Sequence, residues 1–388
     1  MVSKGNRDFS ITVTAFYMKI VGFWQADNYM EERLRKFATI YTFCALFIAL
    51  AVEVRDFYYT WGDFGVSGES NKFMFISLVH KTDLRNLLTY ANEHFWNSDY
   101  DPHEQVLFDT CKRTCTLLIC IFNFFAQTTL FTLLLDNIGR NESERILPFN
   151  MWLDLPLSTS PYFEIAFTIQ VFLLYHVGVC YLCFDNFLFI LNLHTATQFR
   201  ILQHRLTSSC SLIDRGKNYE ITSKPKCDTN QYYTKFRNSI QQHQSLLEYC
   251  EQLENVFTLI VLGQVILFSL MICLDGYLIL MADAPPTLRL TFLSHITDCM
   301  VQLLMFTYSC DTLIRESSNV ARAAYESMWT LLPMNKDGMM VRDDLVLVIM
   351  RSQAPCCLTA GGFFVVSLET YTTVLSTAVS YFTLLTHY

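Results

Sequence analysis

The stretch Cys115–Leu135 reads CTLLICIFNFFAQTTLFTLLL, which is 21 residues without a charged side chain. Lys112 and Arg113 lie just before it, and Asp136 follows it directly. A helix that crosses the hydrocarbon core of a bilayer needs about 20 mostly apolar residues. This stretch therefore predicts a transmembrane helix.

The composition of the whole chain also indicates a membrane protein. Of the 388 residues, 52% are hydrophobic and 16% are charged, whereas about 25% are charged in an ordinary soluble domain. The chain contains 32 Phe, and its mean hydropathy is positive. The net charge of -8 decides little, because membrane proteins are distinguished by where their charges lie. We predict an all-α integral membrane protein.

Five further segments have the length and composition of a span, and a sixth is weaker. The clear segments are Phe37–Val54, Tyr162–Leu193, Val256–Ala282, Leu290–Leu313 and Leu358–Leu385. The weaker segment, Trp61–His80, contains Glu69 and Lys72. We keep it as the second span because the chain must cross the membrane there if the basic residues of the loops are to concentrate on one side. The sequence thus predicts seven transmembrane helices.

The basic residues predict the orientation. With the N-terminus in the cytosol, the inner segments carry 21 Lys and Arg and the outer segments carry 5. Basic residues concentrate on the cytosolic side, so we expect a cytosolic N-terminus and an extracellular C-terminus. The sequon Asn141-Glu142-Ser143 then lies in an outer loop, where Asn141 is a candidate for glycosylation.

Two observations disfavour a G-protein-coupled receptor. Rhodopsin-like receptors have the opposite orientation, and they usually carry an extracellular disulfide. The outer loops near residues 55–72, 136–161 and 283–289 contain none of the fourteen cysteines. We therefore expect no disulfide clamp there.

Motifs of soluble enzymes and nucleic-acid binders are absent from the sequence. It contains no GxGxxG, Walker A, HExxH, GxSxG or paired CxxC motif. The single CxxC, formed by Cys180 and Cys183, lies inside an apolar segment, where packing explains it better than metal or redox chemistry. We expect no enzyme activity, cofactor, metal site or nucleic-acid partner.

The last third of the chain carries a set of motifs. ESSNVARAAYESMW (Glu316–Trp329) precedes MRSQAPCCLTAGGFFVVSLETYTTVLSTAVSYFTLL (Met350–Leu385). This block resembles the insect odorant receptor family. KIVGFW near the start and LPFNMWLDLPLSTSPYFE in the second outer loop resemble the same family, especially its ant, bee and wasp branch.

The resemblance implies a function. It implies an odour-tuned subunit of a ligand-gated, non-selective cation channel in the plasma membrane of olfactory sensory neurons. Such subunits form a heterotetramer with a shared odorant receptor co-receptor, and the last helix of each subunit lines one central pore. The partners implied are the co-receptor, a small volatile odorant, permeating cations and the lipid bilayer.

The spans and the resemblance together predict a division of the chain into six parts. The chain begins with a cytosolic segment, 1–36, followed by helices one to four in 37–193 and an intracellular helical extension with a loop in 194–254. Helices five and six then lie in 255–313, an intracellular anchor region in 314–357 and the pore-lining helix in 358–388. In the family such intracellular helices pack subunits together below the membrane. Tyr325 and Trp329 would lie in this anchor region.

The C-terminal residues Ser380–Tyr388, SYFTLLTHY, then have a role. The resemblance implies that the chain ends at the outer mouth of the pore, with Leu384 at a hydrophobic gate, His387 at the mouth and Ser380 on the same helix. Apolar constrictions gate by excluding water. The alternative is that Leu384 only packs and His387 is an exposed terminal residue.

The outer halves of the spans offer a candidate pocket. An aromatic surface with a few hydrogen-bonding groups suits a small volatile molecule, and the family places its odorant pocket among these helices. The candidates are Phe73, Ile76, Gln127, Thr128, Phe131, Phe163, Phe167, Gln170, Leu293, Ile296 and Thr297. Packing between helices is the alternative for each of them.

One further class of channel stays open. A gustatory-type channel that forms homomers would share the pore helix, although the outer-loop and anchor motifs favour the odorant branch. A transporter is disfavoured because no inverted repeat or pair of broken helices is apparent.

Overall fold

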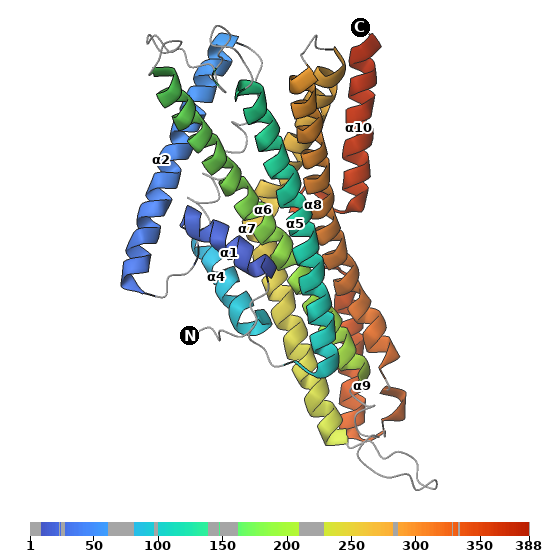
Figure 1. Cartoon of the computed structure of the whole chain (residues 1–388). Coiled ribbons are helices and arrows are strands. Elements are labelled where there is room, and N and C mark those ends of the chain that lie inside the picture. Colours follow the sequence, from blue (N-terminus) through green and yellow to red (C-terminus); the bar gives the residue numbers. More distant parts are fainter. Residues whose placement is uncertain are drawn as a thin grey trace.

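In the computed structural model the chain forms a bundle of long helices (Figure 1). The structure describes residues 9–22, 24, 28–60, 81–96, 100–138, 147, 162–208, 229–281, 286–327, 329–332 and 334–387. The elements are α1 (Phe9–Val21), α2 (Tyr29–Thr60), α4 (Lys81–Ala91), the π-helix η1 (Asn92–Trp96), α5 (Pro102–Ile138), α6 (Tyr162–Ser208), α7 (Thr229–Met281), α8 (Pro286–Glu326), the 3-10 helix η4 (Trp329–Leu331), α9 (Lys336–Ser352), β1 (Thr359–Ala360), β2 (Phe364–Val365) and α10 (Leu368–His387).

Four helices of the described chain are long and apolar enough to cross a membrane. They are Pro102–Leu134 in α5, Tyr162–Ser208, which is α6, Tyr232–Ile279 in α7 and Leu288–Glu326 in α8. The predicted third to sixth spans lie on these helices. The predicted first span lies within α2, and Trp61–His80 lies outside the described residues. The count of seven spans and the orientation stay predictions.

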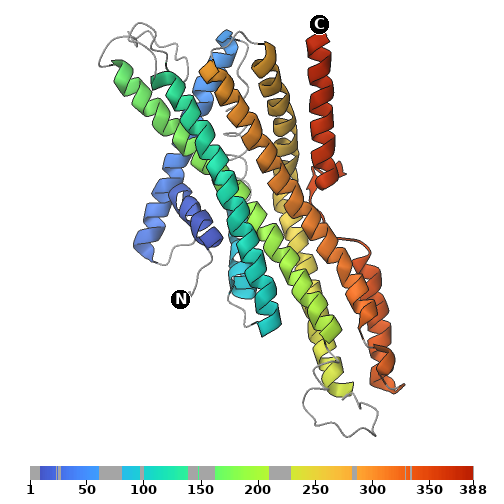
Figure 2. The ribbon, with the colours of Figure 1, turned by 45° about the vertical axis from the view of Figure 1, so that its right-hand side comes forward.

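Two helices are much longer than a bilayer is thick. With 47 residues in α6 and 53 in α7, their lengths are about 70 and 80 Å, against ~30 Å of hydrocarbon. The polar stretch 194–254 was expected to extend the fourth and fifth spans, and within it α6 continues to Ser208 and α7 begins at Thr229, while residues 209–228 lie outside the described residues. Figure 2 shows this extension at the lower end of the bundle, where α9 lies against α8 and α7.

Aromatic side chains fill the lower part of the bundle. Tyr249 of α7 is buried, and its ring lies 5.2 Å from that of Phe95 and 5.0 Å from that of Tyr90. Tyr232, Phe236 and other buried residues belong to the same core cluster. Because charged residues surround this end, the hydrophobic effect stabilises it as it does a soluble helix bundle.

An ion pair with one buried partner joins α5 to α6 near this end. Arg205 donates to Glu104 through Nε at 2.6 Å and through Nη2 at 2.9 Å, and it also donates to Gln242 at 2.9 Å. The side chain of Glu104 is 3% exposed and that of Arg205 is 39% exposed. Two parallel hydrogen bonds from one guanidinium offset the free-energy cost of removing a carboxylate from water.

The last apolar segment differs from the prediction of one helix from Leu358. Residues 359–365 form a hairpin in which β1 and β2 pair antiparallel, and α10 begins only at Leu368. Gly361 and Gly362, with φ of 61° and 77°, make the turn. A positive φ suits glycine and interrupts a helix, which is why the helix starts later than hydropathy indicates.

We predict that Arg205→Ala destabilises the protein by roughly 2–3 kcal/mol, because it leaves a buried carboxylate unpaired, while the half-exposed arginine screens part of the effect. Lys36→Ala is the control. It removes an ion pair with Glu32 whose side chains are 69% and 54% exposed, and we expect almost no change. Thermal midpoints of the purified protein in detergent measure both. Equal midpoints for the two variants would contradict the prediction.

Candidate functional site

Helix α10 packs on the bundle through one face only. Val374 and Ala378 are buried, and Tyr371 and Leu375 pack against the core cluster. In Figure 1 the helix stands at the edge of the bundle, beside α8, and carries the C-terminus. Its opposite face is therefore exposed in a single subunit.

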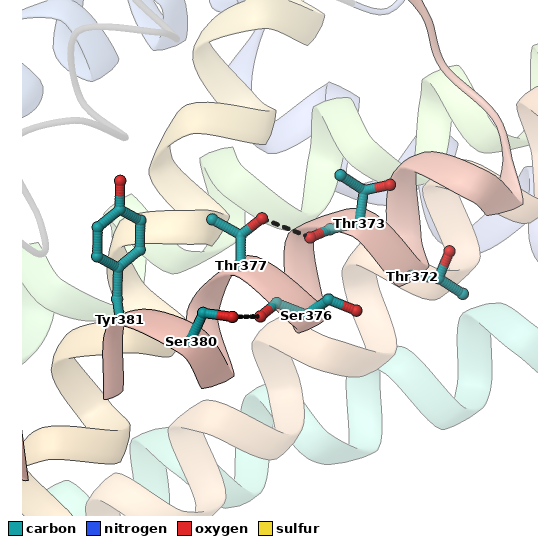
Figure 3. Close-up of a pocket in the computed structure, with 6 residues that line it drawn as sticks. All are labelled: Thr372, Thr373, Ser376, Thr377, Ser380 and Tyr381. Atoms are coloured by element: carbon teal, nitrogen blue, oxygen red, sulfur yellow. Dashed lines mark hydrogen bonds between the residues drawn. The ribbon is translucent and has the colours of Figure 1, made fainter. Parts of the chain in front are cut away.

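The exposed face of α10 bears hydroxyl groups. Six residues line a hollow of about 500 Å³: Thr372, Thr373, Ser376, Thr377, Ser380 and Tyr381. They recur every four residues and so form two rows along one side of the helix, as Figure 3 shows. The packed side of the helix is mainly apolar, and the exposed side bears mainly hydroxyls with Val379 among them.

The hydroxyl protons point back into the helix. Thr373 donates to the carbonyl of Glu369 at 2.9 Å, Thr377 donates to that of Thr373 at 2.8 Å, and Ser380 donates to that of Ser376 at 2.8 Å. Figure 3 shows the last two bonds. Because each proton is used within the helix, the oxygen lone pairs remain free to accept from water or to face a cation.

The exposed face of α5 provides a comparison within the same bundle. It carries Leu117, Ile121, Phe124 and Phe131, which are 37% to 66% exposed, together with one exposed amide, that of Gln127. Such side chains suit contact with lipid, whereas a double row of hydroxyls suits water or another protein surface. The two helices thus expose surfaces of different chemistry.

The hairpin holds the lower end of α10 against α7. Glu254 accepts from the backbone N–H of Thr359 at 2.8 Å and from its hydroxyl. Gly361 donates to the carbonyl of Thr258 at 2.9 Å, and a Cβ at Gly361 would lie 2.7 Å from Leu262. The φ of 61° at Gly361 favours glycine, and its hydrogen bond to Thr258 ties the hairpin before α10 to α7.

The first turn of α10 is capped by Ser367. Its hydroxyl accepts from the N–H of Glu369 at 3.3 Å, and its own N–H donates to the hydroxyl of Thr370 at 3.2 Å. This reciprocal pattern satisfies two backbone donors at a helix start. It fixes the residue at which the helix starts.

The predicted pore residues all fall on α10. Ser380 lies on the hydroxyl face, and Leu384 and His387 lie in the last turns of the helix, which ends at His387. The sequence analysis missed Thr372, Thr373, Ser376 and Thr377. Their recurrence every four residues in an apolar segment was the signal that would have found them.

The predicted pocket residues are spread over three described helices. The rings of Phe163 and Phe167 stack with centroids 5.9 Å apart, and Gln170 on the same helix is 1% exposed. The side chains of Gln127, Phe131 and Leu293 are exposed, and those of Thr128, Ile296 and Thr297 are half-buried. Phe73 and Ile76 lie outside the described residues. The structure therefore brings together the α6 part of the predicted set.

A hydrogen bond connects two of these helices. The hydroxyls of Thr132 on α5 and Ser294 on α8 lie 3.0 Å apart. These residues are the chain neighbours of Phe131 and Leu293, so the α5 and α8 parts of the predicted set lie near one contact between the helices.

The predicted anchor residues lie where α8 ends. The indole N–H of Trp329 donates to the carbonyl of Tyr325 at 3.1 Å, and Tyr325 is 69% exposed. On α9, Met339, Val346 and Leu347 are also exposed. The anchor region therefore presents apolar side chains on its surface.

The predicted glycosylation site, Asn141, lies outside the described residues.

Known proteins resemble the chain in sequence and fold. Odorant receptor 13a of Drosophila melanogaster is 26% identical over 207 residues, which is 50% of this chain and 45% of that protein. Odorant receptor 10 of Aedes albopictus is 26% identical over 242 residues, which is 62% of this chain and 60% of that protein. The matched region thus spans about half to three-fifths of these relatives.

A solved structure has the same fold. The insect olfactory receptor OR5 from Machilis hrabei superposes with a TM-score of 0.81 over 97% of each chain, at 14% identity. The same receptor in complex with eugenol gives a TM-score of 0.78 at 13% identity. Likeness at this identity bears on the fold alone.

A family profile described as "7tm Odorant receptor" matches residues 74–379, which is more than half of the chain. This match confirms the family predicted from the C-terminal motifs, while the ant, bee and wasp branch stays a prediction. The chain belongs to the insect odorant receptor family, and it is a multi-pass membrane receptor rather than an enzyme.

Proposed function

We propose that this chain is the odour-tuned subunit of a ligand-gated, non-selective cation channel. It binds a small volatile molecule in the outer half of the membrane and opens a central pore lined by α10. The observation that carries the proposal is the exposed double row of hydroxyls on α10, in a bundle whose α5 exposes aliphatic and aromatic side chains instead.

The hydroxyl face fits a cation pathway. Oxygen atoms whose protons are used within the helix can face a cation and replace part of its hydration shell. The row from each copy of this chain would line its share of one central polar pore, and the co-receptor would supply the rest of the wall. Leu384, nearer the C-terminus, would form the apolar gate that excludes water when closed, and His387 would lie at the mouth.

The stacked rings on α6 fit the ligand side of the proposal. A flat or branched volatile molecule gains affinity from aromatic faces and from one or two hydrogen bonds. Phe163 and Phe167 provide the faces, and Gln170 provides an amide. The solved relative described as a complex with eugenol supports a ligand of this size.

The assembly and location follow the same proposal. The partner is the odorant receptor co-receptor in a heterotetramer, with the anchor region and its exposed Tyr325 at the contact between subunits. The site of action is the plasma membrane of olfactory sensory neurons, with the N-terminus inside, the C-terminus outside and Asn141 available for glycosylation.

Co-expression with and without a co-receptor tests the proposal. We expect an odorant panel to evoke cation current only when both chains reach the cell surface. Current from this chain alone would indicate the gustatory-type homomeric channel instead. If both chains are present at the surface and no compound in a broad panel evokes current, the proposed function is wrong.

For the pocket, we expect Phe167→Ala and Gln170→Leu to shift half-maximal odorant concentrations by about 5-fold, because a lost aromatic contact or hydrogen bond is worth roughly 1 kcal/mol. Ile169→Ala is the matched control, since Ile169 lies between them and is 52% exposed. Dose–response curves at equal surface expression measure the shift. Unchanged curves for both variants across the panel would refute the pocket position.

A further inference from the structure

Three metal-binding side chains of different chemistry meet between α7 and α8. Asp275 lies near the end of α7, and His295 and Cys299 lie near the start of α8. One potential ligand atom from each lies within 4.8 Å of the others. The odorant-receptor function gives none of these residues a role.

The hydrogen bonds fix the protonation of the imidazole. Nδ1 of His295 lies 2.7 Å from the carboxylate of Asp275, which only accepts, so Nδ1 carries the proton. In the neutral ring, Nε2 then carries the lone pair, which accepts from the thiol of Cys299 at 3.9 Å, and an ion that displaces the thiol proton would bind both atoms. A carboxylate that holds one nitrogen while the other binds a metal is the usual arrangement around metal-bound histidine.

The distance between Nε2 and Sγ fits one bridging ion. Zinc bonds are about 2.0–2.1 Å to nitrogen and about 2.3 Å to sulfur, so an ion bonded to both atoms at this spacing would have an N–Zn–S angle of roughly 125°. That angle is somewhat wider than tetrahedral. The two ligands therefore need little movement to bind such an ion.

Asp298 lies close enough in α8 to offer a further ligand. It follows His295 by three residues, which places the two side chains on the same side of the helix, and its carboxylate would have to rotate to join the three clustered ligand atoms. Asp298 is 7% exposed, and its buried Oδ1 has no hydrogen-bond partner among the described residues. A buried oxygen acceptor without a partner is costly, and a cation would satisfy it.

We propose that these residues bind a zinc-like divalent cation. His295 and Cys299 are the primary ligands, Asp298 supplies an oxygen, and Asp275 positions His295. Imidazole and thiolate favour zinc over calcium or magnesium, which take oxygen ligands. The ion replaces the thiol proton of Cys299, which passes to solvent.

A second cluster in the chain illustrates what such a site requires. Cys111, Cys115 and His194 also lie close together. However, Trp96 donates to Nδ1 of His194 at 2.9 Å, which occupies the lone pair, and all three residues are buried. The side chain of His295, in contrast, is 32% exposed, so a cation can reach it.

The site lies beside the predicted pocket. Ile296 and Thr297 follow His295 directly in α8, and Asp275 belongs to α7, which holds the start of α10. An ion bound here would restrain the outer ends of α7 and α8 relative to each other. The inference concerns binding itself, so it does not depend on the proposed channel function.

Zinc binding to the purified full-length chain in detergent tests the site directly, by competition with a chromophoric chelator. We expect one saturable zinc per chain that is lost in His295→Asn and in Cys299→Ser. Asp275→Asn should weaken binding by about 10–100-fold, as removal of such a supporting carboxylate does elsewhere. Cys273→Ser is the matched control, since it removes a half-buried thiol of α7 and should leave binding intact.

Cobalt provides a readout on the wild-type protein, which avoids variants that fail to fold. Bound Co²⁺ should show the absorption of a cobalt–thiolate bond, and the band should persist in Cys111→Ser and vanish in Cys299→Ser. No cobalt–thiolate band in the folded wild type would overturn the proposal. Equal zinc binding by the wild type and by a folded His295→Asn variant would also overturn it.

Discussion

Hydrocarbon cannot hydrogen-bond to a hydroxyl group, and this constraint decides which surface the hydroxyl face of α10 can contact. The helix buries Val374 and Ala378 against its own subunit and exposes Thr373, Thr377 and Ser380. Each of these hydroxyls satisfies its proton inside the helix, so only oxygen lone pairs remain outward. The exposed face of α10 is therefore suited to water and cations, in a bundle whose α5 exposes Leu and Phe.

The rest of the fold holds that face in place. Glu254 and Thr258 of α7 bind the hairpin that leads into α10, and Gly361 allows the close backbone contact. Helix α7 continues from this point to the lower bundle in one direction and to Asp275 in the other. Helix α7 is thus one continuous element from Asp275 to the contacts that fix the start of α10.

Hydropathy and charge predicted the helical class well, because a long charge-free run such as Cys115–Leu135 has few possible structures other than a membrane-spanning helix. The length of α6 and α7 beyond the membrane was also predictable, since the stretch after His194 is polar but keeps helical periodicity. The hairpin at 359–365 was not, because Gly361 and Gly362 lie in a segment that hydropathy alone assigns to a span. The cluster of Asp275, His295 and Cys299 was not predictable either, because Asp275 reaches the other two only through the packing of α7 on α8.

Cysteine accessibility along α10 tests whether its hydroxyl face lines the pore. Single cysteines at Thr373, Ser376 and Thr377 would be compared with cysteines at Val374 and Ala378, in channels exposed to an impermeant cationic thiol reagent during odorant application. We expect the first three variants to lose current irreversibly, while the last two and the wild type, which carries the native cysteines, do not. Equal effects on both faces, or modification of Val374→Cys and Ala378→Cys alone, would contradict a pore lined by the hydroxyl face.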